Sequence, residues 1–347
     1  MTKGYASLIR AGGKPQERGL PLLPSVSGQV RVFGNRHRFW LELVAVLAFG
    51  PVLALCAQDL APRAYLITPY HSNAVTITWS FYDGSINFNG ALPSSDATGK
   101  YNLAIFNCYH SFGILGRSAN FVAAVPYAEG RFHGTAVGVE RSLHRSGLAD
   151  SFYRFAINLK GGKAMQPSEF IKWHQNLLLG ASLKVMAPTG QYDPTRLINW
   201  GANRWSFKPE FGYSQRWGKW ILDGYSGVLF FTANHDYWSR NVYYPGTRSQ
   251  TQKPMVALEG HMSYDFKRKL WVSLDGNFWI GGVTSVAGID NPLTKQSNSR
   301  LGATASVPLR SHQSLKFGYS EGAYIRFGGN YRNVSIAWQY SWLGRPN

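Results

Sequence analysis

The chain has 347 residues, with 36 Lys and Arg against 18 Asp and Glu, which gives a formal net charge of +18. Only 16% of the residues are charged, 15% are aromatic, and 37 are glycine. This composition argues against disorder, because aromatic residues are plentiful, and against a helical membrane protein, which needs repeated apolar runs of about 20 residues. Two cysteines are too few for a disulfide-rich scaffold or a multi-cysteine zinc site.

The first predicted element is an export signal. A basic stretch with Arg31, Arg36 and Arg38 precedes one apolar run, residues 41–57 (LELVAVLAFGPVLALCA). This order is typical of a secretory signal peptide, so we assign residues 1–57 to a cleaved leader, with cleavage between Cys56 and Gln58. A membrane-anchor helix is the alternative, and the proline and the shortness of the run disfavour it.

A short polar segment follows the leader. Residues 58–72 end in RAYLITPYHS, which is too polar and too interrupted by proline to be another membrane strand. We predict either a plug inside a barrel lumen, where Tyr65 and Tyr70 offer aromatic surface, or a periplasmic tail.

From residue 73 to the end of the chain, the dominant pattern has a period of two, as in strands whose two faces differ. Val75, Ile77 and Trp79, for example, alternate with threonines and a serine. We predict one domain, residues 73–347, with about twelve strands. A short helical turn is expected around 168–174. The predicted strands lie near 73–81, 101–112, 117–127, 153–160, 176–186, 205–214, 219–232, 256–266, 269–281, 300–307, 313–327 and 334–342.

Alternating strands fit either a soluble sandwich or a membrane barrel. The export signal, the aromatic closing strand and the Trp and Tyr residues near strand ends favour an all-β, antiparallel transmembrane barrel. We expect these aromatic residues to form interfacial girdles: Trp200, Trp205, Trp217, Trp220, Tyr237, Trp238, Tyr243, Tyr244, Trp271 and Trp279.

The same alternation assigns charged residues to the barrel lumen. They would either select permeants and set ion preference, or brace a narrow lumen by neutralising one another. The lumen candidates are Arg154, Lys160, Lys184, Lys208, Glu210, Asp223, Glu259, His261, Asp265, Asp275, Arg300, Lys316 and Arg326.

Within this set, Glu259, His261 and Asp265 share one face of a predicted strand. Such a cluster could bind a metal, although a hydrogen-bonded network is the commoner outcome. His261 with Ser263 could instead contribute to a membrane-embedded hydrolase, but the nucleophile-elbow pattern GxSxG does not occur. We therefore predict no catalytic residues, no metal and no cofactor.

Several segments resemble the bacterial outer-membrane family of meta-pathway phenol-degradation transporters. The resemblance covers most of residues 59–343, and PTGQYDP and GANRW are its most specific parts. It implies a single outer-membrane β-barrel that moves small, often aromatic or hydrophobic, compounds. The resembling stretches are 59–65 (DLAPRAY), 184–194 (KVMAPTGQYDP), 197–212 (LINWGANRWSFKPEFG) and 299–308 (SRLGATASVP), with Gly281, Gly282 and the strand from Trp338 to Trp342.

The sequence thus predicts a monomeric channel of the bacterial outer membrane for passive uptake of small organic compounds. A structural or adhesive barrel with a closed lumen is the alternative, and a hydrolase comes third. The expected partners are outer-membrane lipid, lipopolysaccharide, the permeants and the barrel assembly machinery, but not nucleic acid. Lipopolysaccharide would meet arginines in the extracellular loops: Arg131, Arg141, Arg145, Arg240 and Arg248.

Overall fold

The computed structural model describes residues 61–89, 94–136, 139–242, 244–267, 269–310 and 312–344. The predicted leader and its cleavage site lie outside these residues and stay predictions. One short helix, α2 (Pro167–Phe170), overlaps the predicted helical turn. Across the described ranges, no helix is both long and apolar enough to cross a membrane.

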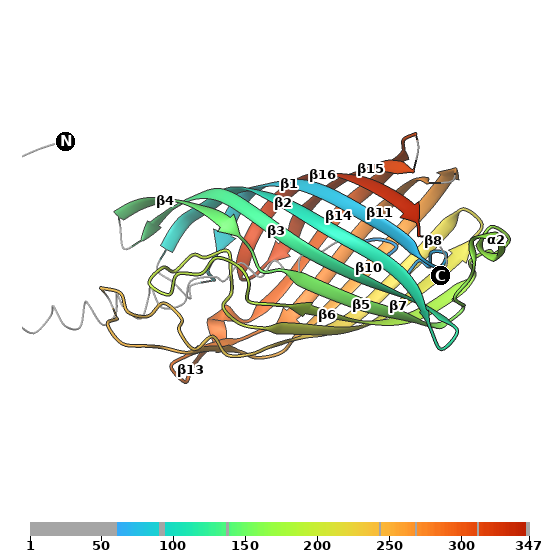
Figure 1. Ribbon diagram of the computed structural model, residues 1–347. Helices are drawn as coiled ribbons and strands as arrows, with labels where there is room; N and C mark the ends of the chain where they lie inside the picture. The colour runs from blue at the N-terminus through green and yellow to red at the C-terminus, as the bar shows by residue number, and fades with distance from the viewer. Residues whose placement is uncertain are drawn as a thin grey trace, which may run out of the picture.

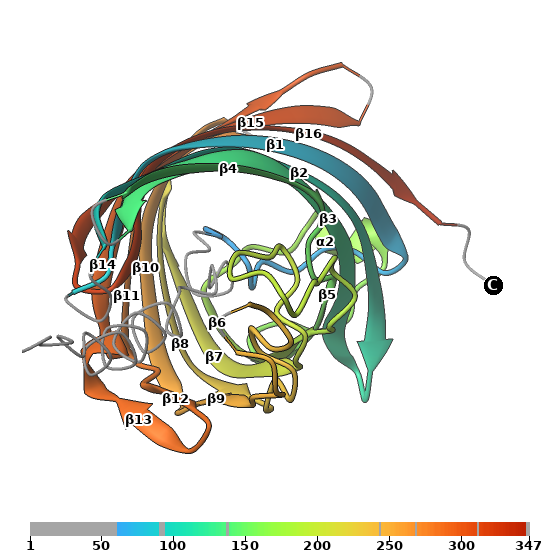
Figure 2. The ribbon, with the colours of Figure 1, turned by 90° about the vertical axis from the view of Figure 1, so that its left-hand side faces the viewer.

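The strands form one closed antiparallel barrel (Figure 1, Figure 2). Thirteen strands belong to the main sheet, and twelve of them follow one another around the ring. The ring closes because β1 pairs with β2 on one side and with β16 on the other. The twelve are β1 (Ser72–Asn87), β2 (Ser94–Ile114), β3 (Arg117–Ala136), β5 (Phe152–Lys160), β6 (Leu177–Met186), β7 (Ser206–Trp217), β8 (Trp220–Phe231), β10 (Met255–Lys267), β11 (Leu270–Gly281), β14 (Gln296–Pro308), β15 (Gln313–Ile325) and β16 (Gly328–Leu343).

The thirteenth strand, β4 (Val139–Leu148), extends the wall at one end. It pairs with β3 from Tyr127 onward, whereas β5 pairs with β3 between Ala119 and Ala124. A separate three-stranded sheet of β9 (Gln250–Gln252), β12 (Thr284–Val286) and β13 (Ile289–Asn291) lies at the same end, next to the 3-10 turn η1 (Pro292–Thr294). The predicted barrel of about twelve strands is therefore confirmed, and β4 is an addition.

Side chains are distributed inside-out relative to a soluble protein. Large apolar side chains on the outer wall are exposed, including Ile77 at 51%, Leu274 at 63% and Leu301 at 60%. Their neighbours in sequence point inward, and His261, Asp275 and Arg300 are among the most buried side chains. An apolar exterior and a polar interior fit a barrel surrounded by lipid and exclude the sandwich.

The connections give the barrel its orientation. Two-residue turns join β2 to β3 and β7 to β8 at the end that carries α2 (Figure 1). Longer connections, residues 187–205, 232–254 and 282–295, lie at the other end. Outer-membrane barrels have short periplasmic turns and longer extracellular loops, so the α2 end is periplasmic.

The prediction of an aromatic girdle is wrong for five of its ten residues. Exposed rings on the outer wall include Trp205, Trp217 and Trp220. Trp271 and Trp279 instead have the same strand parity as Asp275, so their rings face the lumen. Tyr243 lies outside the described residues. The other girdle candidates that are buried within the loops and lumen are Trp200, Tyr237 and Trp238.

Candidate functional site

The segment before β1 is held inside the barrel by polar contacts. The Arg63 guanidinium forms an ion pair with Asp265 at 2.8 Å and lies 4.2 Å from the centre of the Trp271 ring. The backbone N–H groups of Arg63 and Ala64 donate to Asp223 and to the Tyr225 hydroxyl, at 3.2 and 3.0 Å. These contacts fix residues 63–65 against β8, β10 and β11, and Figure 2 shows this blue segment within the ring.

Tyr65 has a seat formed by two glycines. Gly180 and Gly212 are direct cross-strand partners on β6 and β7, and the Tyr65 ring lies on them. A Cβ atom at Gly212 would come within 2.2 Å of that ring. The Tyr65 hydroxyl is 2.9 Å from Ser182 Oγ and donates to Glu210 Oε1, also at 2.9 Å. The ring therefore requires these two positions to lack side chains.

Tyr70, the second plug candidate, lies closer to the periplasmic rim. Its ring is 5.5 Å from that of His71, its hydroxyl lies over Gly113 of β2, and its backbone N–H donates to the Met165 carbonyl. It is partly buried, whereas Tyr65 is buried.

A buried triad of charges joins β7 to β10. The Lys208 ammonium group is 2.6 Å from Glu210 and 2.7 Å from Glu259, and all three side chains are less than a tenth exposed. Glu210 also accepts the hydrogen bond from Tyr65, so the triad connects the wall to the N-terminal segment. Charges buried this deeply need close partners, because each loses its hydration.

A second buried group lies on β10 and β11. His261 Nδ1 is 2.9 Å from Asp275 Oδ1, and the same oxygen accepts a hydrogen bond from Ser273. The other Asp275 oxygen accepts from the Thr304 hydroxyl at 2.6 Å. Glu259 is farther away, at 3.8 Å from His261 Nε2. The group is a hydrogen-bonded network that crosses the strands.

This arrangement bears on the metal and hydrolase alternatives. Asp265 does not join Glu259 and His261, because it is paired with Arg63 and Arg216. Within the part of the chain that the structure describes, no group of three His, Cys, Asp or Glu side chains could hold a metal ion. The buried Ser263 hydroxyl has no hydrogen-bond partner among the described residues, so it is not activated by His261.

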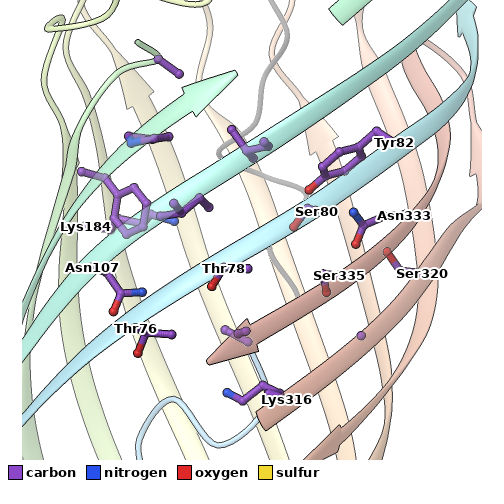
Figure 3. A pocket seen from close by; sticks show the side chains of 18 of the residues that line it. Thr76, Thr78, Ser80, Tyr82, Asn107, Lys184, Lys316, Ser320, Asn333 and Ser335 are labelled. Atoms are coloured by element: carbon purple, nitrogen blue, oxygen red, sulfur yellow. The ribbon is translucent and has the colours of Figure 1, made fainter. Parts of the chain in front are cut away.

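The barrel lumen contains a cavity of about 460 Å³ (Figure 3), and Asp275 is one of the residues that line it. Hydroxyl and amide side chains from β1 and β16, among them Thr76, Ser80 and Asn333, form one wall. Lys184 and Lys316 enter from other strands, as Figure 3 shows. Pro62, from the segment before β1, also lines the cavity. We call this cavity the lumen chamber.

The remaining predicted lumen residues divide into two groups. Arg154 lies 4.7 Å from the Tyr65 ring, and Arg300 is buried and donates to the Ser320 hydroxyl and the Tyr331 carbonyl. Two others are not brought into these clusters. Lys160 follows a bulge at the periplasmic end of β5 and is exposed, and Arg326 lies in the turn before β16.

Aromatic packing covers the extracellular side of the chamber. Trp200, from the loop 187–205, packs against Tyr101 at 5.5 Å and Phe132 at 5.9 Å between ring centres. Asp150 holds this loop by accepting the backbone N–H groups of Gly190 and Ala202, at 2.9 and 2.8 Å. The GANRW motif therefore belongs to a loop that packs inward.

The same loop contains a carboxylate with a lowered pKa. The Asp193 side chain accepts hydrogen bonds from the Thr195 hydroxyl and backbone N–H, and it pairs with Arg196 at 2.8 Å. These contacts, the Thr195 hydroxyl above all, lower the pKa of Asp193. Asp193 thus stays ionised at neutral pH and holds this turn of the loop.

Sequence reasoning missed the role of several residues. Arg63, Arg216 and Tyr225 all contact the lumen network, but none was a lumen candidate. Arg216 lies near the end of β7, and Tyr225 lies on β8. Each has the same parity as the inward-facing residues of its strand. That parity could have identified Tyr225, whereas the Arg63 contacts depend on where the N-terminal segment enters the barrel.

Comparisons with known proteins agree with the barrel fold. The model of the family described as "Putative MetA-pathway of phenol degradation" matches residues 81–336. An outer membrane channel from Pseudomonas putida F1 is similar in structure, with a TM-score of 0.67 at 17% identity, over 82% of this chain and 100% of that chain. This likeness shows the fold.

A second solved structure, the transport unit of the autotransporter AIDA-I from Escherichia coli, has a TM-score of 0.46 at 10% identity. That match covers 88% of this chain and 97% of the other, and it is too weak to carry an inference. A comparison with curated protein sequences found no significant match.

Proposed function

The chain belongs to the family described as "Putative MetA-pathway of phenol degradation", and from that premise we propose that it is an outer-membrane channel for passive uptake of small organic compounds. The Pseudomonas putida F1 protein of similar fold is an outer membrane channel. No energy-coupling motif is needed, because a solute can diffuse down its own gradient through a lined lumen.

The lumen chamber is the observation that carries this proposal. A cavity of about 460 Å³ is large enough for a single-ring compound, and small ligand sites typically begin at about 300 Å³. Tyr82, Trp200 and Phe231 give its lining aromatic surface, while Ser and Thr hydroxyls supply polar contacts. Such a mixture suits compounds with an aromatic ring and a polar group.

The segment 58–72 is proposed to act as a lumen plug rather than a periplasmic tail. Support comes from the contacts of Arg63, Ala64 and Tyr65 with six strands, and from the two glycines beneath the Tyr65 ring. A segment held this closely narrows the path between the lumen chamber and the periplasm. Tyr70 would form the lower part of the plug.

Lipopolysaccharide is the proposed partner of the outer rim. Arg131 and Arg141 are exposed on β3 and β4, where anionic groups can reach them. Arg248 fits this role less well, because its guanidinium lies between the Trp238 and Tyr244 rings at 4.7 and 4.5 Å. Neutralising Arg131 and Arg141 should weaken retention on lipopolysaccharide vesicles.

We further propose that the barrel is inserted by the barrel assembly machinery, works as a monomer, needs no cofactor and has no catalytic role. The hydrolase alternative lacks support, because the Ser263 hydroxyl and His261 are not hydrogen-bonded to each other. The closed-lumen alternative is favoured by one observation, the dense contacts around Tyr65. A closed barrel would act through its loops instead.

Liposome swelling tests the proposal. Vesicles that contain the refolded mature chain should swell in solutions of small aromatic compounds faster than vesicles without protein. A barrel that shows heat-modifiable migration, and so is folded, but gives no swelling with any small organic solute would support the closed lumen and reject the channel.

A further inference from the structure

A β-bulge at the periplasmic end of β5 turns a lysine toward the outside of the barrel. Asn158 still lies opposite Gly180, on which the Tyr65 ring rests, so both residues face the lumen. The register then shifts by one residue, and Lys160 lies opposite Leu179. Leu179 precedes Gly180 in its strand and therefore faces outward, and direct cross-strand partners share one face. The bulge thus re-aims Lys160 from the lumen to the outer side.

Two further cations share this side of the barrel. Arg117, the first residue of β3, has the same parity as Phe121 and Val125, which are 41% and 50% exposed on the outer wall. Lys163 follows β5 and forms an isolated antiparallel bridge with Arg117, so their side chains are neighbours on one face. All three cations, Arg117, Lys160 and Lys163, are exposed. We call these three residues the rim cluster.

The rim cluster brings like charges together. Arg117 and Lys163 are direct cross-strand partners, and such pairs of equal charge are destabilising. Within the ranges that the structure describes, no ion pair includes any of the three residues. Glu169 is the one acidic residue of the connection 161–176, and it accepts the backbone N–H of Gln166. An anion bound between the three cations would offset their repulsion.

The surroundings of the rim cluster favour a lipid over a soluble anion. Leu159, next to Lys160, is 46% exposed on the outer wall, and Phe121 lies on the same wall four residues along β3 from Arg117. The cluster lies at the α2 end of the barrel (Figure 1), which is periplasmic, whereas lipopolysaccharide occupies the opposite leaflet. A phospholipid of the periplasmic leaflet brings a phosphate group and acyl chains to the same place.

We propose that the rim cluster binds the phosphate group of an anionic phospholipid, of the phosphatidylglycerol class, in the periplasmic leaflet. Guanidinium and ammonium groups donate hydrogen bonds to phosphate oxygens, and an arginine can donate two parallel ones. The acyl chains would lie along the apolar wall beside Leu159. The inference is independent of transport, because it concerns the outer side of the barrel and not the lumen.

Native mass spectrometry of the refolded mature chain tests the proposal. The protein is released from detergent micelles that contain phosphatidylglycerol or, in a parallel titration, phosphatidylcholine with the same acyl chains. Phosphatidylglycerol should bind at least about tenfold more tightly, because each cation near a lipid surface adds to the attraction of anionic headgroups. Equal affinities for the two lipids would overturn the proposal.

Neutral variants locate the site. The triple variant R117Q/K160Q/K163Q should lose about tenfold in phosphatidylglycerol affinity and keep its affinity for phosphatidylcholine. The charge-conserving variant R117K/K160R/K163R should bind phosphatidylglycerol like the wild type, and loss of the preference there would count against the site. Should the neutral triple variant not fold, Lys160→Gln alone should lower the affinity about threefold. Unchanged affinity in Lys160→Gln would then overturn the site.

A matched variant removes the same charge elsewhere on this end of the barrel. K219Q/K267Q/K269Q neutralises three exposed lysines near the ends of β7, β10 and β11. It should bind phosphatidylglycerol within about twofold of the wild type, because charges away from the bound phosphate are screened. An equal loss of affinity in both neutral triple variants would mean a general attraction to a basic rim, and would overturn a site at the rim cluster.

Inorganic phosphate separates a lipid site from a site for a soluble anion. Calorimetric titration of millimolar phosphate into the refolded chain, in zwitterionic detergent micelles without lipid, should show no saturable binding. Saturable binding of phosphate that R117Q/K160Q/K163Q abolishes would assign the rim cluster to a soluble anion and overturn the proposed lipid.

Discussion

The hydroxyl group of Tyr65 donates a hydrogen bond to Glu210 Oε1 over 2.9 Å, although the two residues are 145 positions apart in the sequence. Glu210 is at the same time paired with Lys208, so one carboxylate serves both the wall and the segment that precedes β1. In the proposed plug, the free path through the lumen depends on how firmly this segment stays in place.

The seat of Tyr65 gives the first prediction. Gly212→Ala places a methyl group where the Tyr65 ring lies, so the ring must move. We expect the single-channel conductance of this variant to rise by about twofold or more, because conduction through a narrow pore depends on its free cross-section. Planar-bilayer recording of the refolded barrel measures the change.

Gly224→Ala is the matched control for this variant. Gly224 lies on β8, and a Cβ atom there would meet no heavy atom of the described residues within 4 Å. Its conductance should equal that of the wild type. If Gly212→Ala also left conductance unchanged while the variant folded, the Tyr65 segment would not narrow the pore.

Deletion of residues 58–70 tests the whole segment. The deletion leaves β1, which begins at Ser72, and removes Arg63, Tyr65 and Tyr70. If the segment is a plug, conductance should increase more than in Gly212→Ala, and current noise should change with it. Unchanged conductance in a folded barrel would favour the periplasmic-tail interpretation.

The buried charge triad predicts a large loss of stability. Among the ion pairs of the described residues, Lys208 is the only cation that contacts both Glu210 and Glu259. Lys208→Met removes this cation and leaves two buried carboxylates. The free energy of unfolding should fall by about 3–5 kcal/mol, as is typical when one partner of a buried ion pair is removed. Urea titration of the refolded barrel, followed by tryptophan fluorescence, measures this difference.

Two variants provide the comparison for Lys208→Met. Lys253→Met breaks a pair with Asp290 in which both side chains are about half exposed, and should leave stability nearly unchanged. The triple variant K208M/E210Q/E259Q should recover much of the loss. A Lys208→Met barrel as stable as Lys253→Met would contradict the triad's role.

The outer wall provides a prediction about the membrane. Leu274 is 63% exposed, about midway along β11, on the face assigned to lipid. Leu274→Arg should destabilise the inserted barrel by about 2–4 kcal/mol, the cost of a cation near the bilayer midplane. Leu115→Arg, in an exposed periplasmic turn, should have little effect. Equal stability of the two variants in lipid vesicles would argue that β11 does not face lipid.

Most of the barrel could be predicted from the sequence, because a period of two reports directly which residues share a face. Val75, Ile77 and Trp79 alternate with hydroxyl residues, and Ile77 and Trp79 are exposed while Thr76 and Thr78 line the lumen chamber. The method failed where residue type was used without parity. Trp271 was assigned to a girdle, although it has the same parity as the lumen residue Asp275.

The site was harder to predict, because its contacts join distant strands. Lys208 and Glu259 are separated by β8, and only the register of three strands brings them to 2.7 Å. Parity placed both side chains in the lumen but could not pair them. Strand β4 was missed because its stretch, VERSLHRSGL, lacks the apolar alternation of a lipid-facing strand.

The central claim is that the lumen conducts small aromatic solutes, and single-channel recording of the refolded mature chain in a planar bilayer tests it most directly. We expect discrete conductance steps that added benzoate blocks in a concentration-dependent way. A folded, heat-modifiable barrel that shows no steps under any condition would contradict the account and leave a closed barrel that acts through its loops.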